Sequence, residues 1–484
     1  MTSCPLSRLF FCGSLLVALV GSTPVSPSWH LKRDPPLAAR DDPLGGIAAL
    51  PPDSISQPGM LSSNLTVISD AIASHQAGRP EVVSAYKSIF EAVKPASTPT
   101  TIQDILAIME DEYTGSTSSL IDSAASLYLH GLDPGNVKVS LAKRGGIDID
   151  STDNSNPEPP TTIYPQSSSA DPSYSILEKA LRSAIYIPSA FEFGRGSKQT
   201  VILVPGTAVP GGTTYKGNFA KLLSSTTWAD PLWLNIPGFS LGDIQANAEY
   251  VAYAIHYISA ITGGRNVSVI TWSQGSLDTQ WGLKYWPSTR GLVSDHIAVS
   301  GDYHGTKLAY TLCPGFPLNM LLGCTPSILQ QTYDSNLIRK LRSSGGDSAY
   351  IPTTTIYSGT DEIVQPQSGS GASSFLNDAR TVGVSNNQVQ VVCGPGSLAG
   401  GFYGHAGVLI HPLAWELTVD ALQHPGPGQV SRLNVPNVCR TPAANGLTAG
   451  DVLLTEAMTV TGALNALAYS PRVDSEPAFK PYVT

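Results

Sequence analysis

Short apolar runs and helical repeats alternate along the chain after residue 171. Apolar or β-branched runs are typical of buried strands, and repeats at three- and four-residue spacing are typical of helices. Their alternation predicts an α/β fold, in which a mostly parallel sheet is covered by helices on both faces. The predicted strands span residues 200–204, 232–236, 266–272, 296–300, 353–357 and 389–392, and the main helices span 243–261 and 274–285.

Upstream of residue 145 the apolar residues follow helical spacing only. They repeat in this way over 65–72, 82–93, 102–113 and 121–128. We therefore predict a small module of about four helices. It contains no cluster of titratable residues that suggests chemistry, so it could aid folding, cap an active site or serve as a spacer.

The first residues predict export from the cell. Arg8 precedes an apolar run at 9–20, and the small residues Gly21 and Ser22 follow it. A membrane-spanning helix needs roughly 20 apolar residues, so residues 1–22 are predicted to be a secretory signal peptide. We expect an extracellular protein without a transmembrane anchor.

A dibasic pair suggests how the chain is divided. Lys143-Arg144 precedes a tract at 148–169 that is rich in Ser, Asp, Asn and Pro and has no periodic apolar pattern. A dibasic pair can be plain surface charge, but a signal, this pair and a polar tract in that order favour a pro-region. The predicted divisions are a helical pro-region over 23–144, a flexible linker over 145–170 and a catalytic domain over 171–484.

Charge excludes one class of partner. Charged residues make up only 13% of the chain, below the quarter or so that is usual in soluble domains, which fits an extracellular protein. The formal net charge is −9, and no run of Lys or Arg could follow a phosphate backbone. Nucleic acid is therefore excluded as a partner. Separately, we expect the protein to be a monomer.

The cysteines predict disulfide bonds. Cys4 and Cys12 lie in the predicted signal peptide. The four others are Cys313, Cys324, Cys393 and Cys439. An even number in an oxidising compartment predicts two disulfides. Short separations favour Cys313–Cys324 and Cys393–Cys439, although three connectivities are possible.

Two sequons are candidate glycan acceptors, Asn64-Leu65-Thr66 and Asn266-Val267-Ser268. The second lies at the start of the predicted strand 266–272. A glycan on Asn266 would therefore have to lie at the edge of the sheet opposite to an active site at the end of that strand.

Ser273 stands where a strand turns into a helix, in the stretch Thr271-Trp272-Ser273-Gln274-Gly275. This is the position of the nucleophile in the G-x-S-x-G elbow of α/β-hydrolases. Thr271 replaces the first glycine, and Gly275 keeps the second. From this pattern alone, Ser273 could equally be a nucleophile or a helix cap.

An acid and a histidine follow Ser273 in the order that α/β-hydrolases use. Asp361 follows the predicted strand 353–357, and His405 lies in a glycine-rich loop. A serine hydroxyl needs a histidine to take its proton, and the histidine needs an acid to orient it. Two neighbours compete: Glu362, interpreted as a solvated loop charge, and His411, interpreted as packing against or capping the next helix.

The tetrahedral oxyanion of such chemistry needs fixed N–H donors. Gln274, directly after the nucleophile, could supply one, and the turn at Gly206 and Thr207 could supply the other. No H-E-x-x-H motif or paired His and carboxylate motif occurs, so neither a metal nor another cofactor is expected.

Five motifs, "LVPGT", "TWSQGSLDTQWGL", "DYHGT", "YSGTDEIVQPQ" and "CGP…HAG", resemble those of the fungal lipases related to Candida antarctica lipase B. The resemblance runs in collinear order from about residue 171 to the C-terminus, and that family also carries threonine in place of the first elbow glycine. It implies an α/β-hydrolase fold preceded here by the helical module. The residues it assigns are Ser273, Asp361 and His405 as the triad, Thr207 and Gln274 as the oxyanion hole, and Trp272, Asp302, Ile363 and Val364 around the substrate.

The chain departs from that family at several points. Gly404 precedes the histidine where the relative has an acid, and two of the relative's three disulfides have no counterpart. Cys313 and Cys324 are additional and frame an apolar loop where the relative has a small mobile cover, which suggests a more defined lid or a stapled surface loop. A tail helix over about 447–469 would form the other wall of the entrance. The helical module lies outside the resemblance.

We therefore predict a secreted serine hydrolase that cleaves carboxylic esters through an acyl-enzyme and acts on an ester or lipid substrate at a lipid–water interface. A triacylglycerol lipase is the leading hypothesis. A carboxylesterase or cutinase is the alternative within the class, and an inactive hydrolase-fold binding module or a serine peptidase is the alternative outside it.

Overall fold

The computed structural model describes residues 97–114, 120–133, 148–313 and 323–483. The chain divides into compact units at 1–43 and 44–484, and all described residues belong to the second unit. The predicted signal peptide, the sequon at Asn64 and the pair Lys143-Arg144 lie outside the described residues.

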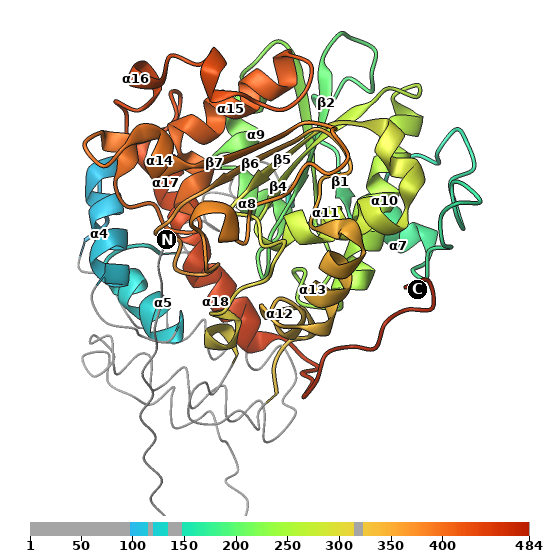
Figure 1. Cartoon of the computed structure of the whole chain (residues 1–484), viewed down its shortest axis with the longest axis horizontal. Coiled ribbons are helices and arrows are strands. Elements are labelled where there is room, and N and C mark those ends of the chain that lie inside the picture. Colours follow the sequence, from blue (N-terminus) through green and yellow to red (C-terminus); the bar gives the residue numbers. More distant parts are fainter. Residues whose placement is uncertain (1–96, 115–119, 134–147, 314–322, 484) are drawn as a thin grey trace, which may run out of the picture. The chain divides into compact units, whose positions relative to one another are not determined.

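A seven-stranded sheet forms the centre of the fold, in the order β1-β3-β2-β4-β5-β6-β7 (Figure 1). All neighbouring strands are parallel except β1 and β3, which pair antiparallel. The strands are β1 Ile185–Tyr186, β2 Gln199–Val204, β3 Ala229–Leu234, β4 Val267–Trp272, β5 Val293–Val299, β6 Thr353–Tyr357 and β7 Val384–Gln388. The expected α/β-hydrolase fold is confirmed.

Successive residues of the central strands point to opposite faces, and each face has its own core. Val267 and Val269 of β4 pack with helix α10, Ile244–Ile261, and helix α11, Gln274–Tyr285. Ile270 and Trp272 of β4 pack on the other face, with residues of α8, α9 and α15. The other α-helices between residues 148 and 446 are α7 Glu178–Ser183, α8 Gly211–Tyr215, α9 Phe219–Ser224, α12 Pro326–Gln330, α13 Asn336–Leu341, α14 Val389–Cys393, α15 Pro412–Gln423 and α16 Val435–Val438.

The last strand was predicted in the wrong place. Residues 389–392 lie in helix α14, and the edge strand β7 is formed by the polar residues before it. In β7, Asn386 accepts a hydrogen bond from the Thr355 hydroxyl (2.9 Å) and Asn387 donates to the Thr355 carbonyl (3.1 Å). Side-chain amides therefore stabilise this edge, and an apolar pattern could not reveal it.

Residues 148–170 are not the flexible linker that composition predicted. The carbonyl of Ile149 accepts hydrogen bonds from the Trp233 indole N–H (2.8 Å) and the Asn235 amide (2.9 Å). Asp150 accepts two from Thr213, and Ile163 is only 4% exposed. These contacts join the segment to the sheet although it has neither strand nor helix periodicity.

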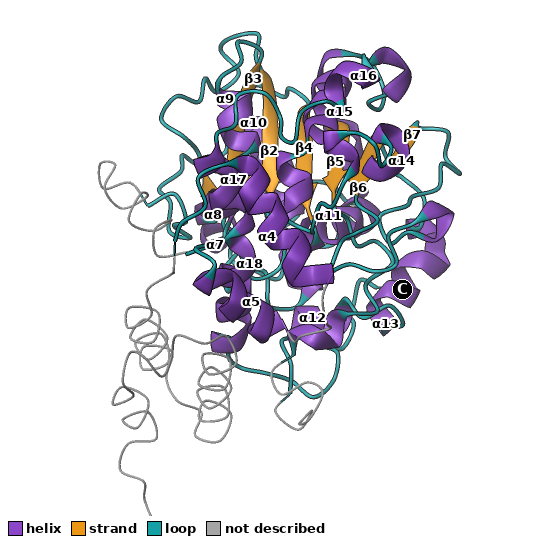
Figure 2. Cartoon of the chain, turned by 90° about the vertical axis from the view of Figure 1, so that its left-hand side faces the viewer, coloured by secondary structure: helices purple, strands orange, loops and turns teal. Residues whose placement is uncertain are grey.

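Two of the predicted N-terminal helices lie within the described residues, as α4, Ile102–Thr114, and α5, Leu120–Leu129 (Figure 2). Ile105 and Met109 of α4 are fully buried one turn apart. The predicted tail helix is divided at Ala457 into α17, Ala449–Glu456, and α18, Met458–Ala468. Helix α4 contacts α17, and α5 contacts α18. Within the described part of the chain, no helix is both long and apolar enough to cross a membrane.

Candidate active site

Ser273 occupies a sharp turn between β4 and α11. Its backbone has φ 54° and ψ −132°, in a region that non-glycine residues rarely adopt and that is typical of functional turns. Two glycines make room for it. A Cβ atom on Gly206 would lie 2.7 Å from the Ser273 Cβ, and one on Gly275 would lie 2.6 Å from the carbonyl oxygens of Val204 and Pro205.

Thr271 does not occupy one of these close approaches. Its side chain is buried, and its Oγ1 lies 2.7 Å from the Ser276 hydroxyl and 3.0 Å from Nε2 of His296. Burial lowers the pKa of His296 to about 3, so this imidazole is neutral. The threonine at this elbow position is thus one member of a buried polar group that joins β4, β5 and α11.

Asp361 and His405 are brought together at the carboxyl edge of the sheet. Nδ1 of His405 lies 2.7 Å from Oδ2 of Asp361. The other carboxylate oxygen accepts the backbone N–H groups of Ile363 (2.9 Å) and Val364 (2.7 Å), which fix the acid in place. The remaining ring nitrogen of His405, Nε2, is buried without a hydrogen-bond partner among the described residues. It is the nitrogen available to take a proton from the cavity that Ser273 also lines.

Two opposing effects act on the pKa of His405. Burial acts to lower the pKa of this imidazole, but the charge and hydrogen bond of Asp361 outweigh it, so the pKa of His405 is raised above its usual value. Such an arrangement stabilises the imidazolium formed during general-base catalysis. Asp302 is fully buried and does not line the cavity; burial raises its pKa to about 7. Asp302 was expected beside the substrate, but it does not line this cavity. Its charge acts on His405 and helps to raise the pKa of that imidazole.

The loop that carries His405 is held on its inner side. The His405 carbonyl accepts hydrogen bonds from the Trp272 indole (3.1 Å) and from the Ser300 hydroxyl (3.1 Å). Glu362 was interpreted as a solvated loop charge, and this is wrong. Its carboxylate accepts the backbone N–H of His405 at 2.7 Å, while Asp361 alone contacts the imidazole among these two acids.

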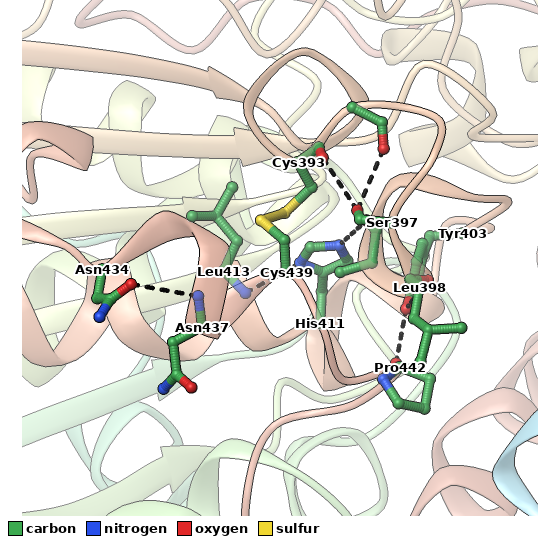
Figure 3. The surroundings of a disulfide bond; sticks show 12 residues. Cys393, Ser397, Leu398, Tyr403, His411, Leu413, Asn434, Asn437, Cys439 and Pro442 are labelled. Carbon is green, nitrogen blue, oxygen red and sulfur yellow. Dashed lines mark hydrogen bonds between the residues drawn. A yellow bond between two sulfur atoms is a disulfide. The ribbon is translucent and has the colours of Figure 1, made fainter.

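A disulfide supports the start of the same loop (Figure 3). Cys393 at the end of α14 is bonded to Cys439 beside α16, as predicted. The Tyr403 hydroxyl donates to the carbonyl of Pro442 at 2.6 Å. His411 is the N-cap of α15 and accepts the N–H of Leu413 at 3.0 Å, which confirms its interpretation as a helix cap.

The cavity beside Ser273 has mostly apolar walls. It encloses about 670 Å³, counting its opening to solvent. Trp272, Ile363 and Val364 line it as expected, together with Ser273 and His405. Helix α18 forms another wall, as predicted for the tail helix, through Met458, Thr459, Gly462, Ala463 and Ala466.

The second predicted disulfide, Cys313–Cys324, is also present. Both cysteines are buried in an apolar cluster with Ala309 and Ile328, two residues of the cavity wall. Cys324 exchanges two backbone hydrogen bonds with Val473 of the C-terminal tail (2.9 and 2.8 Å). The expected lid at 314–322 lies outside the described residues.

The residues expected to form the oxyanion hole lie side by side. Gln274 is the first residue of α11, where backbone N–H groups have no acceptor within the helix. The Thr207 hydroxyl is within donating distance of the amide oxygens of Gln274 (2.8 Å) and Gln331 (3.0 Å). Gln331 also donates to Gln274 at 2.8 Å and lines the cavity. Sequence reasoning missed Gln331, because it follows α12 in a stretch without a motif.

Asn266 is exposed and directly precedes β4. Ser273 follows the other end of this strand, so the sequon lies at the opposite edge of the sheet. This is the placement that a glycan on Asn266 would require.

Comparison with known proteins shows extensive similarity to two fungal lipases. No family model matches the chain. Lipase B of Pseudozyma antarctica is 34% identical over 318 residues, which are 65% of this chain and 87% of that protein. The crystal structure of Aspergillus fumigatus lipase B has a TM-score of 0.76 and 45% identity, and the match covers 87% of this chain and all of that one. That share is more than residues 171–484 can supply, so the similarity includes part of the N-terminal segment, contrary to expectation.

Proposed function

The chain belongs to the fungal lipase B family, and on this basis we propose that it is a carboxylic ester hydrolase in which Ser273, His405 and Asp361 form the catalytic triad. The observation that carries the proposal is the hydrogen bond between His405 and Asp361 at the cavity that Ser273 lines from its strained turn.

In the proposed mechanism, Oγ of Ser273 attacks the ester carbonyl while Nε2 of His405 takes its proton. Asp361 holds the imidazole in the tautomer that leaves Nε2 free and stabilises the imidazolium. The imidazolium then protonates the departing alcohol. Water, activated by the same histidine, hydrolyses the acyl-enzyme and releases the acid.

The negative charge on the carbonyl oxygen requires donors that are already in place. We assign this role to the backbone N–H of Gln274 and to Thr207. The hydrogen bonds among Thr207, Gln274 and Gln331 support the assignment, because they fix both donor residues before a substrate arrives. Removal of one such donor typically slows an enzyme by about 10²- to 10³-fold.

The walls of the cavity support an apolar acyl or alkyl group as part of the substrate. Ile363, Val364 and Met458 offer apolar surface, and Gly462 and Ala463 leave space along α18. We therefore propose a triacylglycerol lipase that works at a lipid–water interface, with a carboxylesterase or cutinase as the alternative. We further propose that the protein is extracellular, monomeric and glycosylated, and that the chain is cleaved after Lys143-Arg144.

The test is hydrolysis of p-nitrophenyl esters and emulsified triglycerides of increasing chain length by the full chain and by Ser273→Ala. The substitution should reduce kcat by more than about 10³-fold while the thermal unfolding profile is kept. Ser294→Ala, at the far end of β5, is the matched control and should keep full activity. Activity retained in Ser273→Ala would refute the triad, and a preference for short soluble esters would favour the esterase alternative.

A further inference from the structure

Two glutamates lie against the loop that carries His405. Glu362 accepts the backbone N–H of His405 at 2.7 Å, and a Cβ atom on Gly404 would lie 2.7 Å from the same carboxylate oxygen. Glu456, at the end of α17, approaches the backbone at Gly407, where a Cβ atom would lie 2.9 Å from its Oε1. At each of these two glycines, a carboxyl group therefore lies close to the backbone, in space that a side chain would need.

Helix α4 contributes a third buried polar group to this compartment. The Tyr113 hydroxyl is buried, and the charges of Glu362 and Glu456 both act on it. Among the described residues, neither the Tyr113 hydroxyl nor the Glu456 carboxyl has a hydrogen-bond partner, and Oε1 of Glu362 has none either. Such buried, incompletely paired groups are costly, so a functional reason for their presence is expected.

The same helix packs directly on this region. Ile105 of α4 belongs to an apolar cluster with Tyr403, two residues before His405, with Ile410 and with Val452 of α17. Ile105 is fully buried by these contacts. Helix α4 thus covers both the histidine loop and the helix that ends in Glu456.

We propose that Glu362 and Glu456 are positioning residues for the catalytic His405, and that helix α4 completes their compartment by covering it with Tyr113. The inference rests on the proposed role of His405 as the general base. Glu362 orients the loop through its hydrogen bond, and Oε1 of Glu456 lies close to Gly407, two residues after His405. Ionisation of both carboxyl groups would place two like charges beside one loop, among buried polar atoms, and the loop would shift to separate them.

The charge states support this arrangement near neutral pH. Burial, then the neighbouring Asp361, raises the pKa of Glu362 to about 7. Burial, then the charge of Glu362, raises the pKa of Glu456 to about 8. The pair therefore holds at least one proton at pH 7 and loses it in the alkaline range. The other titratable groups that act on the compartment are Asp361, His405 and Asp302 at the triad, Tyr403 on the loop and Glu112 on α4.

The first test is the pH profile of kcat on a soluble p-nitrophenyl ester between pH 5 and 10, for the full chain and Glu456→Gln. The wild type should lose activity with a midpoint near pH 8, and the substitution should move this midpoint upward by at least one pH unit. Asp111→Asn, at an exposed position on α4, is the matched control and should leave the profile unchanged. Identical alkaline midpoints in wild type and Glu456→Gln would overturn the proposal.

The second test separates positioning from general stability. Glu362→Ala should reduce kcat at least tenfold with little change in KM, and Glu362→Gln, which keeps an acceptor for the His405 N–H, should restore most of it. If Glu362→Gln is as slow as Glu362→Ala, the positioning role of this hydrogen bond is wrong.

The third test concerns α4. Tyr113→Ala should admit water to the compartment and move the alkaline midpoint to lower pH, whereas Tyr113→Phe should leave it in place. If Tyr113→Ala fails to fold, hydrogen exchange of the wild type and Glu456→Gln replaces it. Protection of the amides at 404–407 and in α4 should fall between pH 6 and 9 only in the wild type. Equal protection changes in both proteins would refute the role of α4.

A fourth measurement distinguishes failure of this inference from failure of the proposed function. It follows the NMR resonance of the His405 Nδ1–H proton, which is expected at low field, as the pH is raised. Absence of ester hydrolysis in the wild type would refute the function. The resonance would still show whether Glu456→Gln extends the hydrogen bond between His405 and Asp361 to higher pH. An unchanged pH response of this signal would overturn the positioning inference by itself.

Discussion

The disulfide between Cys393 and Cys439 should be the larger of the two covalent contributions to stability. It closes a loop with a sequence separation of 46, whereas Cys313–Cys324 closes one of 11. Loop-closure entropy in the unfolded chain then gives about 4 kcal/mol for the first bond and about 2.8 kcal/mol for the second. Replacing each pair of cysteines with serine should therefore produce two losses in the free energy of unfolding that differ by about 1.2 kcal/mol.

Urea unfolding, followed by tryptophan fluorescence and by circular dichroism, measures both losses on the same protein background. Each double variant is compared with the other; Cys313, Cys324 and Cys439 are nearly fully buried, and Cys393 is partly buried. The Cys393→Ser/Cys439→Ser variant should also lose kcat, because its disulfide supports the start of the His405 loop. The reasoning is refuted if removal of Cys313–Cys324 costs as much as removal of Cys393–Cys439, or more.

Three further outcomes are expected. Thr271→Val should lower the free energy of unfolding by about 1–3 kcal/mol, because Ser276 and His296 lose a buried partner; an unchanged melting temperature would contradict this. Gly275→Ala should cost about 1–3 kcal/mol and reduce kcat, because its new Cβ would meet two carbonyl oxygens at 2.6 Å; full activity would show that the turn can relax. Between pH 5 and 8 the folded state keeps a proton on Glu456 that the unfolded state has released, so stability should fall as pH rises, by at most about 1.4 kcal/mol per pH unit. Urea titrations of wild type and Glu456→Gln at several pH values check this. If the free energy of unfolding depends on pH equally in both proteins, the expectation is wrong.

The central strands and the long helices were predictable because burial on both faces of a parallel sheet leaves an apolar signal in the sequence. Strand β7 lies at the edge of the sheet, where the side-chain amides of Asn386 and Asn387 form hydrogen bonds with Thr355 of β6. It therefore carries no such apolar signal. The segment at 148–170 was mistaken for a linker for a related reason. It is fixed by single hydrogen bonds to carbonyl and carboxylate groups, which composition does not record.

The residues now proposed as the triad were predictable because their order along the chain and the turn at Ser273 form a local pattern. The supporting groups were not. Gln331, Glu362 and Glu456 come from separate parts of the chain, and their roles depend on which side chains the fold places beside them. A glutamate in solvent and a glutamate buried beside the His405 loop are the same residue in the sequence.

The left-handed backbone at Ser273 also bears on how such a chain can change over generations. At φ 54° glycine is the residue with the least strain, and a non-glycine residue there costs on the order of 1 kcal/mol. A drift from serine to glycine would therefore make the fold more stable while removing the proposed nucleophile. Selection for stability and selection for chemistry oppose each other at this one position. A descendant freed from its reaction should lose Ser273 early, before its core or its disulfides change.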